Sequence, residues 1–191
     1  MRIAMTITST KDRIRQEALR LFVERGVDAV SVRDIAKAVG MSAPNLYAHY
    51  KGRDELVADL FQAGYASYGR QLQDIADGSG SFAERLEAMI RLICRLHDAD
   101  RTLFQFLLLN QHTHLNRVAP DDSGNPMAVL HRLITKAVEA GEMPIADPAL
   151  LTAAVVGIVV QAATFRLYGR ISRDLEPMAD EIIALCAKVL A

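Results

Sequence analysis

Apolar residues recur at intervals of three and four along almost the whole chain, which is the spacing of amphipathic helices. The first such segment covers residues 10–25 and is followed by Gly26, where the C-cap of a helix would sit. Its apolar stripe comprises Ile14, Ala18, Leu21 and Phe22. We therefore predict a first helix over residues 10–25.

Two shorter helices are predicted directly after it. The second covers residues 31–40, where a serine N-cap is followed three residues later by Asp34. Its apolar stripe comprises Val32, Ile35, Ala36 and Val39. The third covers residues 42–50, with Pro44 in its first turn, where a missing amide hydrogen costs nothing. Two short helices joined by a tight turn at Gly40 are typical of a helix-turn-helix.

The rest of the chain has the same helical spacing, separated by breaks rich in Pro, Gly, Asp and Asn. Strict alternation of apolar and polar residues bounded by turns does not occur, so no strand is predicted. The sequence therefore predicts an all-α fold of nine helices. The six further helices are predicted at residues 53–77, 82–97, 101–111, 127–140, 149–168 and 175–190.

Charge is unevenly distributed, although the formal net charge of the 191 residues is −1. Residues 1–54 hold ten Lys or Arg and six Asp or Glu, a balance of +4. Residues 55–191 hold the remaining twelve and seventeen, a balance of −5. A basic N-terminal part on an acidic body suits a protein that meets phosphate with one end only.

Composition indicates a soluble globular protein, with 51% apolar and 24% charged residues. Cys94 and Cys186 fit no metal or redox spacing, so we expect buried free thiols in a reducing cytoplasm. Residues 1–9 contain no apolar run of a secretory signal and are predicted to form a flexible arm. The uncharged stretch 148–165 is too short and too diluted for a membrane span, so a buried interface helix is favoured.

One face of the third predicted helix suits a DNA major groove. With Leu46 pointing inward, a rotation of about 100° per residue places Tyr50 on the same side. The outward face carries no charge and little apolar bulk: Pro44, Asn45, Tyr47 and Ala48. Ala43 and Ala48 can meet thymine methyl groups, and Asn45 can offer both donor and acceptor to a base edge.

Potential phosphate ligands surround this face, and they would fix register and affinity more than sequence choice. They are the hydroxyls of Ser31, Ser42 and Tyr47, the imidazole of His49, and the cations of Lys51 and Arg53. Arg33 is placed to reach guanine as a bidentate donor, or alternatively to pair with Asp34 or Asp28 on the surface. Packing rather than DNA contact is favoured for Tyr50, and His49 could be simply solvated.

Four runs within about the first 55 residues resemble the N-terminal signature of the tetracycline-repressor (TetR) family. They are Ser31-Val32-Arg33-Asp34-Ile35-Ala36, Val39-Gly40-Met41-Ser42, Leu46-Tyr47-Ala48-His49-Tyr50-Lys51 and Glu55-Leu56. The resemblance places base and phosphate contacts on Arg33, Ala43, Pro44, Asn45, Tyr47, Ala48, His49, Lys51 and Arg53. Tyr50 stands where phenylalanine is common in the family, and Arg53 where lysine is common.

The resemblance also implies a homodimer whose recognition helices enter successive major grooves of a near-palindromic operator. A C-terminal domain would bind a small molecule and change the distance between the two DNA-binding domains of the dimer. We therefore expect an arm at 1–9, a helix-turn-helix DNA-binding domain at 10–55, and a helical regulatory and dimerisation domain at 56–191.

The second domain offers candidates for a dimer interface and for a ligand pocket. Small residues in the uncharged helix would let a partner helix approach, and the final helix would complete a four-helix bundle. The predicted interface comprises Ala153, Ala154, Gly157, Ile158, Ala162, Ile182, Leu185 and Cys186. The predicted pocket lining comprises Phe104, Gln105, Leu108, Gln111, Gln161 and Phe165. Few ionisable groups occur in these helices, which favours a neutral or aromatic effector; Arg166 and Arg170 could instead recognise a carboxylate.

No cofactor, metal site or catalytic motif is predicted. His112 and His114 would lie about 200° apart on a helix, without a supporting ligand. The leading interpretation is a repressor that a small-molecule effector releases from its palindromic operator. The alternatives are an activator or a regulator controlled by a protein partner, and a small-molecule-binding or enzymatic helical protein without specific DNA binding.

Overall fold

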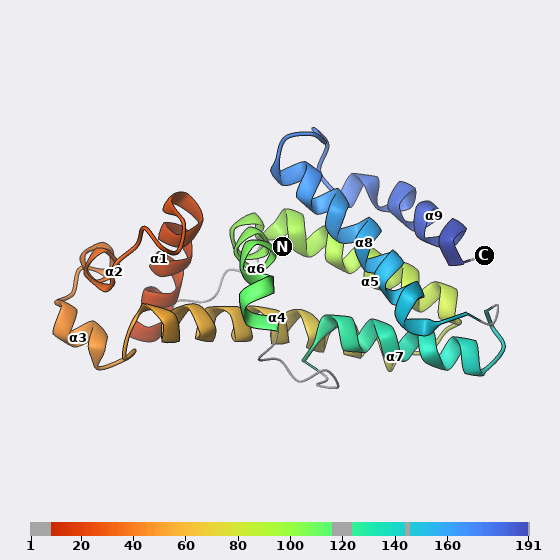
Figure 1. Ribbon diagram of the computed structural model, residues 1–191, viewed down its shortest axis with the longest axis horizontal. Coiled ribbons are helices and arrows are strands. Elements are labelled where there is room, and N and C mark those ends of the chain that lie inside the picture. The colour runs from red at the N-terminus through yellow and green to blue at the C-terminus, as the bar shows by residue number, and fades with distance from the viewer. Residues whose placement is uncertain (1–8, 116–123, 144–145, 191) are drawn as a thin grey trace. The chain divides into compact units, whose positions relative to one another are not determined.

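The computed structural model describes residues 9–115, 124–143 and 146–190 (Figure 1). The predicted arm lies outside these residues except for Ser9. Within them the regular structure is helical throughout, which confirms the predicted all-α fold. The α-helices are α1 (Thr10–Arg25), α2 (Val32–Val39), α3 (Ala43–Tyr47), α4 (Arg53–Ala76), α5 (Phe82–Ala99), α6 (Arg101–His114), α7 (Pro126–Glu139), α8 (Pro148–Leu167) and α9 (Ala179–Leu190), with the 3-10 helix η2 (Glu176–Met178) before α9.

Reciprocal capping explains where the first two helices begin. The Ser9 hydroxyl accepts from the Asp12 amide at 3.1 Å, and the Asp12 carboxylate accepts from the Ser9 amide at 3.1 Å. Ser31 and Asp34 repeat this arrangement at the start of α2. Each box satisfies two amide donors that have no partner within the helix.

The last helix begins four residues later than the sequence predicts, at Ala179 instead of Leu175. Pro177 lies in this segment and has no amide hydrogen, and the chain forms a 3-10 turn there. The Asp98 carboxylate accepts from the amides of Leu175 and Glu176, at 3.2 and 2.7 Å. A carboxylate from α5 therefore caps the turn from outside.

The chain divides into two compact units. The first contains the described part of Met1–Gly64 and Asp100–Arg117, that is, α1 to α3, the start of α4, and α6. All four apolar residues of the predicted α1 stripe are buried here. Phe22 stacks on Phe106 with ring centroids 6.1 Å apart, and Phe61 stacks on His114 at 5.1 Å. Helix α6 thus packs in this unit, while the functional division at residue 55 stays a prediction.

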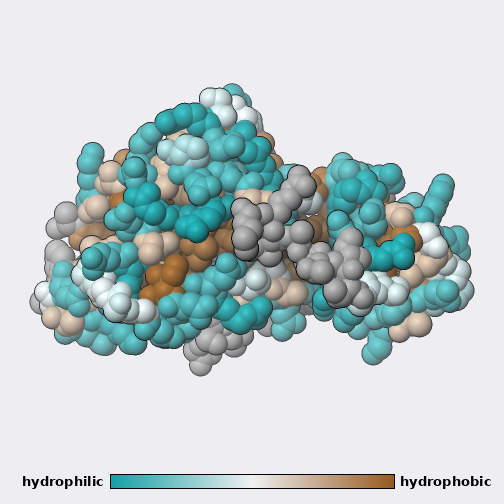
Figure 2. All heavy atoms as spheres, turned by 180° about the vertical axis from the view of Figure 1, so that it is seen from behind, coloured by the Kyte–Doolittle hydropathy of each residue, from teal (hydrophilic) through white to brown (hydrophobic). Residues whose placement is uncertain are grey.

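The second unit contains the described part of Tyr65–Ala99 and Val118–Ala191, with α5, α7, α8, α9 and the end of α4. Cys94 and Cys186 are both 0% exposed and are free thiols, as predicted. Burial raises the pKa of each thiol to about 11, so both are protonated at neutral pH. In the space-filling view most of the visible surface is hydrophilic, with apolar patches between hydrophilic stretches (Figure 2).

Gly69 permits a close approach between two backbones in the second unit. It lies within α4, opposite Gly124, which precedes α7. A Cβ atom on Gly69 would overlap the carbonyl group of Gly124, because backbone and not a flexible side chain occupies that space. The packing of α4 in this unit therefore requires glycine at this position.

We expect Gly69→Ala to lower the free energy of unfolding by about 1–3 kcal/mol, since the added methyl group forces a backbone shift. Urea unfolding monitored by circular dichroism measures this change. Gly52→Ala is the matched control, because a Cβ at Gly52 meets nothing within 4 Å. Equal stability of both variants would contradict this account of the close approach.

Candidate nucleic-acid interface

A glycine in the left-handed backbone conformation forms the turn between α2 and α3. Gly40 adopts φ 76° and ψ 35° directly after α2, a conformation that a side chain disfavours. The amide of Met41 then donates to the carbonyl of Ala36 at 2.9 Å, which closes the end of α2. Ser42 caps α3 and accepts from the Asn45 amide at 3.4 Å. These contacts build a helix-turn-helix from residues 31–50.

Burial confirms the predicted orientation of α3. Leu46 and Tyr50 are 0% and 2% exposed, so this side packs inward. Helix α3 ends at Tyr47 instead of about residue 50, and the chain continues in a turn that brings Tyr50 to the buried side. The exposed residues on and just after α3 are Pro44, Asn45, Tyr47, Ala48 and His49, whereas Ala43 is half-buried.

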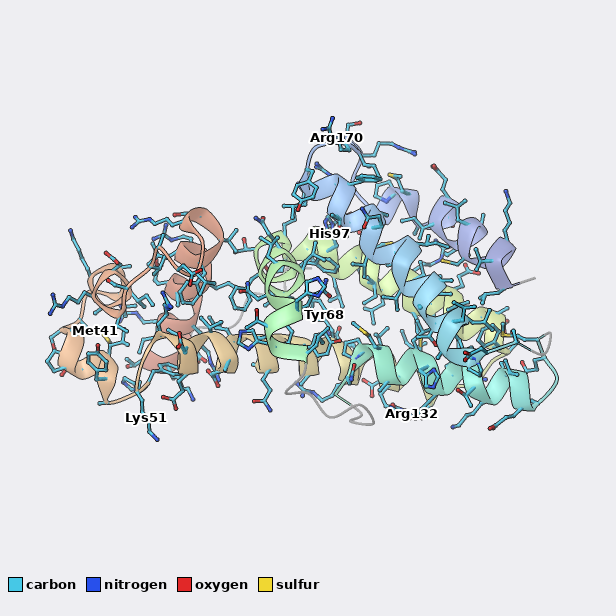
Figure 3. The ribbon with its side chains drawn as sticks, viewed as in Figure 1. Met41, Lys51, Tyr68, His97, Arg132 and Arg170 are labelled. Atoms are coloured by element: carbon cyan, nitrogen blue, oxygen red, sulfur yellow. The ribbon has the colours of Figure 1, made fainter. Side chains whose placement is uncertain are left out.

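Two exposed cations, one on α2 and one just after α3, have no ion-pair partner within the described residues. Arg33 on α2 and Lys51 before α4 are both exposed, and the Lys51 side chain extends into solvent (Figure 3). The alternative partners of Arg33 are engaged elsewhere. Asp34 accepts from the Ser31 hydroxyl and amide, and Asp28 lies 3.6 Å from the Arg53 guanidinium. Both cations are therefore available to a negatively charged ligand.

Two other predicted phosphate ligands also stabilise the fold. The Ser31 hydroxyl belongs to the capping box of α2. The Arg53 guanidinium donates to the carbonyls of Val27 and Asp28 at 3.3 and 3.2 Å, and so ties the start of α4 to the turn before α2. These contacts do not exclude phosphate, but they give each side chain a second role.

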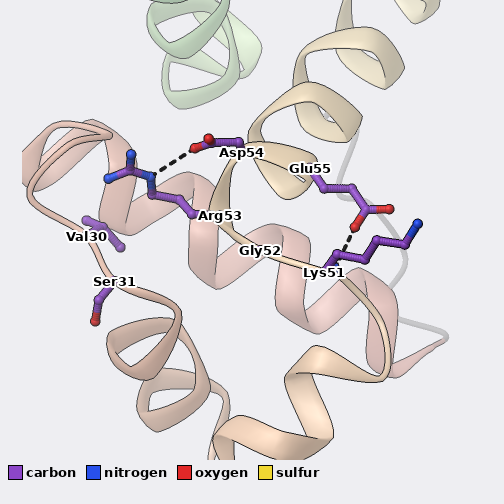
Figure 4. Close-up of a pocket in the computed structure, with 7 residues that line it drawn as sticks. All are labelled: Val30, Ser31, Lys51, Gly52, Arg53, Asp54 and Glu55. Atoms are coloured by element: carbon purple, nitrogen blue, oxygen red, sulfur yellow. Dashed lines mark hydrogen bonds and ion pairs between the residues drawn. The ribbon is translucent and has the colours of Figure 1, made fainter.

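Three predicted contacts line one surface hollow of about 490 Å³ (Figure 4). Its wall is formed by Val30, Ser31, Lys51, Gly52, Arg53, Asp54 and Glu55. The N-terminal ends of α2 and α4 border this hollow, and such ends carry partial positive charge. The Glu55 carboxylate accepts from the backbone amide of Lys51 at 2.5 Å, and this bond does not involve the Lys51 ammonium group.

A polar junction lies on the buried side of this segment, and the sequence pattern did not predict it. Arg15 donates to both carboxylate oxygens of Asp59, at 2.7 and 2.8 Å, and the Tyr50 hydroxyl donates to Asp59 at 2.6 Å. Lys11 lies 5.2 Å from the centre of the Tyr50 ring. The signal that could have found it is a carboxylate within the apolar run 56–61.

Ionisation of the junction follows from these contacts. Burial acts to raise the pKa of Asp59, but the hydrogen bonds from Arg15 and Tyr50 and the charges of Arg15 and Lys11 together lower it. Burial, together with the hydrogen bond to Asp59, raises the pKa of Tyr50. At neutral pH the junction therefore holds an ionised carboxylate and a neutral tyrosine.

Comparison with known proteins identifies this segment. Residues 14–60 match the model of the bacterial regulatory proteins of the tetR family. Residues 14–60 therefore belong to the TetR family. KstR2 of Mycobacterium tuberculosis, a transcriptional repressor, is 31% identical over 88 residues, 46% of this chain and 44% of that protein. YttP of Bacillus subtilis, a probable transcriptional regulator, is 30% identical over 101 residues, 52% of this chain and 49% of that protein. These TetR-family matches thus span less than half of the relatives' length.

Solved TetR-like structures share the fold over nearly the whole chain. The fatty acid degradation regulator FadR of Bacillus halodurans has a TM-score of 0.80 at 20% identity, covering 93% of this chain and 94% of that one. FadR of Bacillus subtilis, solved in complex with stearoyl-CoA, has a TM-score of 0.77 at 17% identity, covering 94% and 99%. At these identities the likeness concerns the fold alone.

The predicted interface residues fall into two groups. Ala153, Gly157 and Leu185 are exposed, and Ala154, Ile158 and Ala162 are half-buried. Ile182 and Cys186, by contrast, are 3% and 0% exposed in the single chain. Helix α9 turns these two residues inward within its own unit, and their assignment to a dimer interface stays a prediction.

Helix α8 carries an exposed and mostly apolar stripe. By length and composition it could span a membrane, and 22% of its most apolar window is buried. One helical face of α8 carries the exposed residues Leu150, Ala153, Gly157, Gln161 and Phe165, and the exposed Tyr168 follows at the end of the helix. A Cβ atom on Gly157 would meet nothing within 4 Å, so the centre of the stripe is open.

The predicted ligand pocket combines residues of separate units and stays a prediction. Phe104 is buried and Gln105, Leu108 and Gln111 are half-buried on α6, whereas Gln161 and Phe165 are exposed on α8. Arg166 donates to Asp174 at 3.0 Å, and Arg170 is exposed (Figure 3). His112 is exposed and His114 is buried, so the two rings face different sides of α6.

The second role of Arg53 can be measured in the absence of DNA. We expect Arg53→Ala to lower the free energy of unfolding by about 1–2 kcal/mol, because two carbonyl groups lose their donor. Lys51→Ala should change it by less than about 0.5 kcal/mol, since an exposed and unpaired side chain is removed. Chemical denaturation of both variants checks the difference, and an unchanged stability of Arg53→Ala would show that its contacts are incidental.

Proposed function

We propose that this chain is a sequence-specific DNA-binding transcriptional regulator that acts as a homodimer in the cytoplasm. The observation that carries the proposal is the exposed, uncharged face of α3, with the exposed cations Arg33 before it in the chain and Lys51 after it, neither of which has an ion-pair partner within the described residues. Such a face fits a major groove, and cations at its edges fit the phosphate backbone. The names of the bacterial relatives support the same function.

We further propose that it is a repressor released from its operator by a small molecule. KstR2 is named a transcriptional repressor, and a protein of the same fold was solved with stearoyl-CoA. The distance between the two DNA-binding domains can differ between conformations of the dimer. An effector that binds one of these conformations better than another would shift the equilibrium between them. Activation, or control by a protein partner, would use the same DNA-binding face.

Selection of the purified protein against random double-stranded DNA at physiological salt tests the proposal. We expect a near-palindromic site with half-sites about one helical turn apart. The same selection with Arg33→Ala should relax the preference at one guanine. Weak, steeply salt-dependent binding without sequence preference would favour the alternative of a helical protein without specific DNA binding.

Tyr47→Ala and Lys51→Ala should each weaken binding to the selected site by about tenfold, a loss of about 1.4 kcal/mol. Both side chains are exposed, so the dimer and the melting temperature should stay nearly unchanged. Fluorescence anisotropy with labelled duplex, together with thermal melting, measures the two effects. If either variant unfolds, the assignment of these side chains to the DNA face fails.

Dimerisation is proposed to use the exposed stripe of α8 with the exposed side of α9. Leu150, Phe165 and Tyr168 are 69%, 46% and 64% exposed, and Leu185 and Val189 on α9 are 52% and 45% exposed. Apolar side chains at this spacing favour burial against a second helix pair. The open space at Gly157 would allow that partner to approach closely.

Gly157→Arg should convert the dimer to a monomer, because a long cation fills the space for the partner helix. Sedimentation velocity measures the change. Ala83→Arg, at an exposed position of α5, is the matched control and should leave the dimer intact. A dimer that persists in Gly157→Arg would exclude α8 from the interface.

A further inference from the structure

Helix α3 is too short to fix its own orientation. Helix α3 has five residues, and an isolated helix of that length is unstable in water. Its one buried residue is Leu46, and the hydrogen bond to its Ser42 cap is long, at 3.4 Å. Apolar burial of Leu46 is not directional. It therefore fixes how deeply α3 packs more than how α3 is rotated about its axis. Contacts outside the helix must therefore set the direction of the exposed face.

Tyr50 supplies such a contact, four residues after Leu46. Its ring is 2% exposed, and its hydroxyl donates to a carboxylate oxygen of Asp59 on α4 at 2.6 Å. A hydrogen bond to an ionised acceptor is both directional and stronger than one between neutral groups. The chain directly after α3 is thus tied to one point on α4.

Asp59 is itself fixed in place from α1. Arg15 donates to both of its oxygens, at 2.7 and 2.8 Å, and a bidentate pair of this kind allows little rotation. The side chains of Arg15 and Asp59 are 22% and 26% exposed, so water screens the pair only in part. Lys11 adds a second cation 3.9 Å from Asp59. The acceptor that Tyr50 meets is therefore itself held by two cations of α1.

We propose that Asp59 is a positioning residue of the DNA-binding face, which orients α3 through the Tyr50 hydroxyl before DNA arrives. The Tyr50 ring provides burial, and the hydroxyl provides direction. Base contacts tolerate displacements of only about 0.5 Å, so a loss of direction should affect sequence reading more than phosphate binding. For its effect on DNA the inference rests on the proposed function, but the ordering of α3 does not.

Tyr50→Phe tests the proposal, because it keeps the ring and removes the hydroxyl. Tyr65→Phe is the matched control: Tyr65 is also a buried tyrosine whose hydroxyl meets a side-chain oxygen, Asn125 Oδ1, at 3.4 Å. The measurements are affinity for the selected site, affinity for a random-sequence duplex, and amide hydrogen exchange of residues 46–50 without DNA.

We expect Tyr50→Phe to lower affinity for the selected site about tenfold and to change affinity for random duplex less than about twofold. Amides 46–50 should exchange about tenfold faster, since the end of α3 opens more often. Tyr65→Phe should change none of the three. In an Asp59→Ala background, Tyr50→Phe should have no further effect, because its partner is already absent.

Two results would overturn the proposal. One is wild-type affinity and wild-type exchange in Tyr50→Phe. The other is an equal loss of affinity for the selected and the random duplex, accompanied by a lower melting temperature, which indicates general destabilisation. If the wild-type protein selects no DNA site, the proposed function fails instead, and the exchange of amides 46–50 still decides the role of Asp59.

Discussion

Helix α3 has only five residues, and the structure of the first unit depends on how that helix is held. Its own hydrogen bonds are too few to maintain it, because nucleation of a helix is unfavourable. The surrounding helices supply the support. Arg13 on α1 donates to the Val39 carbonyl at the end of α2 at 2.9 Å, and Arg15 holds Asp59. Helix α1 therefore supports both sides of the helix-turn-helix.

Charged residues that are close in sequence divide into two functional groups. Arg33 and Lys51 are exposed and unpaired within the described residues, while Arg15 and Arg53 are engaged by a carboxylate and by backbone carbonyls. The basic N-terminal part is therefore not a uniform cationic surface. Some of its charge builds the scaffold, and the remainder is available to phosphate.

In the second unit the apolar residues likewise divide into two groups, those buried within the chain and those exposed on its surface. Ile182 and Cys186 on α9 are buried, while Leu185 between them is half exposed. On α8 the exposed stripe is itself apolar, so the usual contrast between a polar and an apolar face is absent. An apolar helix of this kind gives little sequence signal for which side packs within the chain and which side remains for a partner.

The all-α fold, the start of α2 at its capping box, the inward side of α3 and the TetR-family resemblance could be predicted from the sequence. These features are local, because caps, turns and helical spacing act over a few residues. Tertiary structure alone decided the partners of Asp59, the second role of Arg53, the packing of α6 in the first unit, and the inward turn of Cys186. Each of these joins residues distant in sequence, as with Arg15 and Asp59, which are 44 positions apart. No local pattern encodes which helices meet, because that choice depends on how all of the apolar surfaces are buried together.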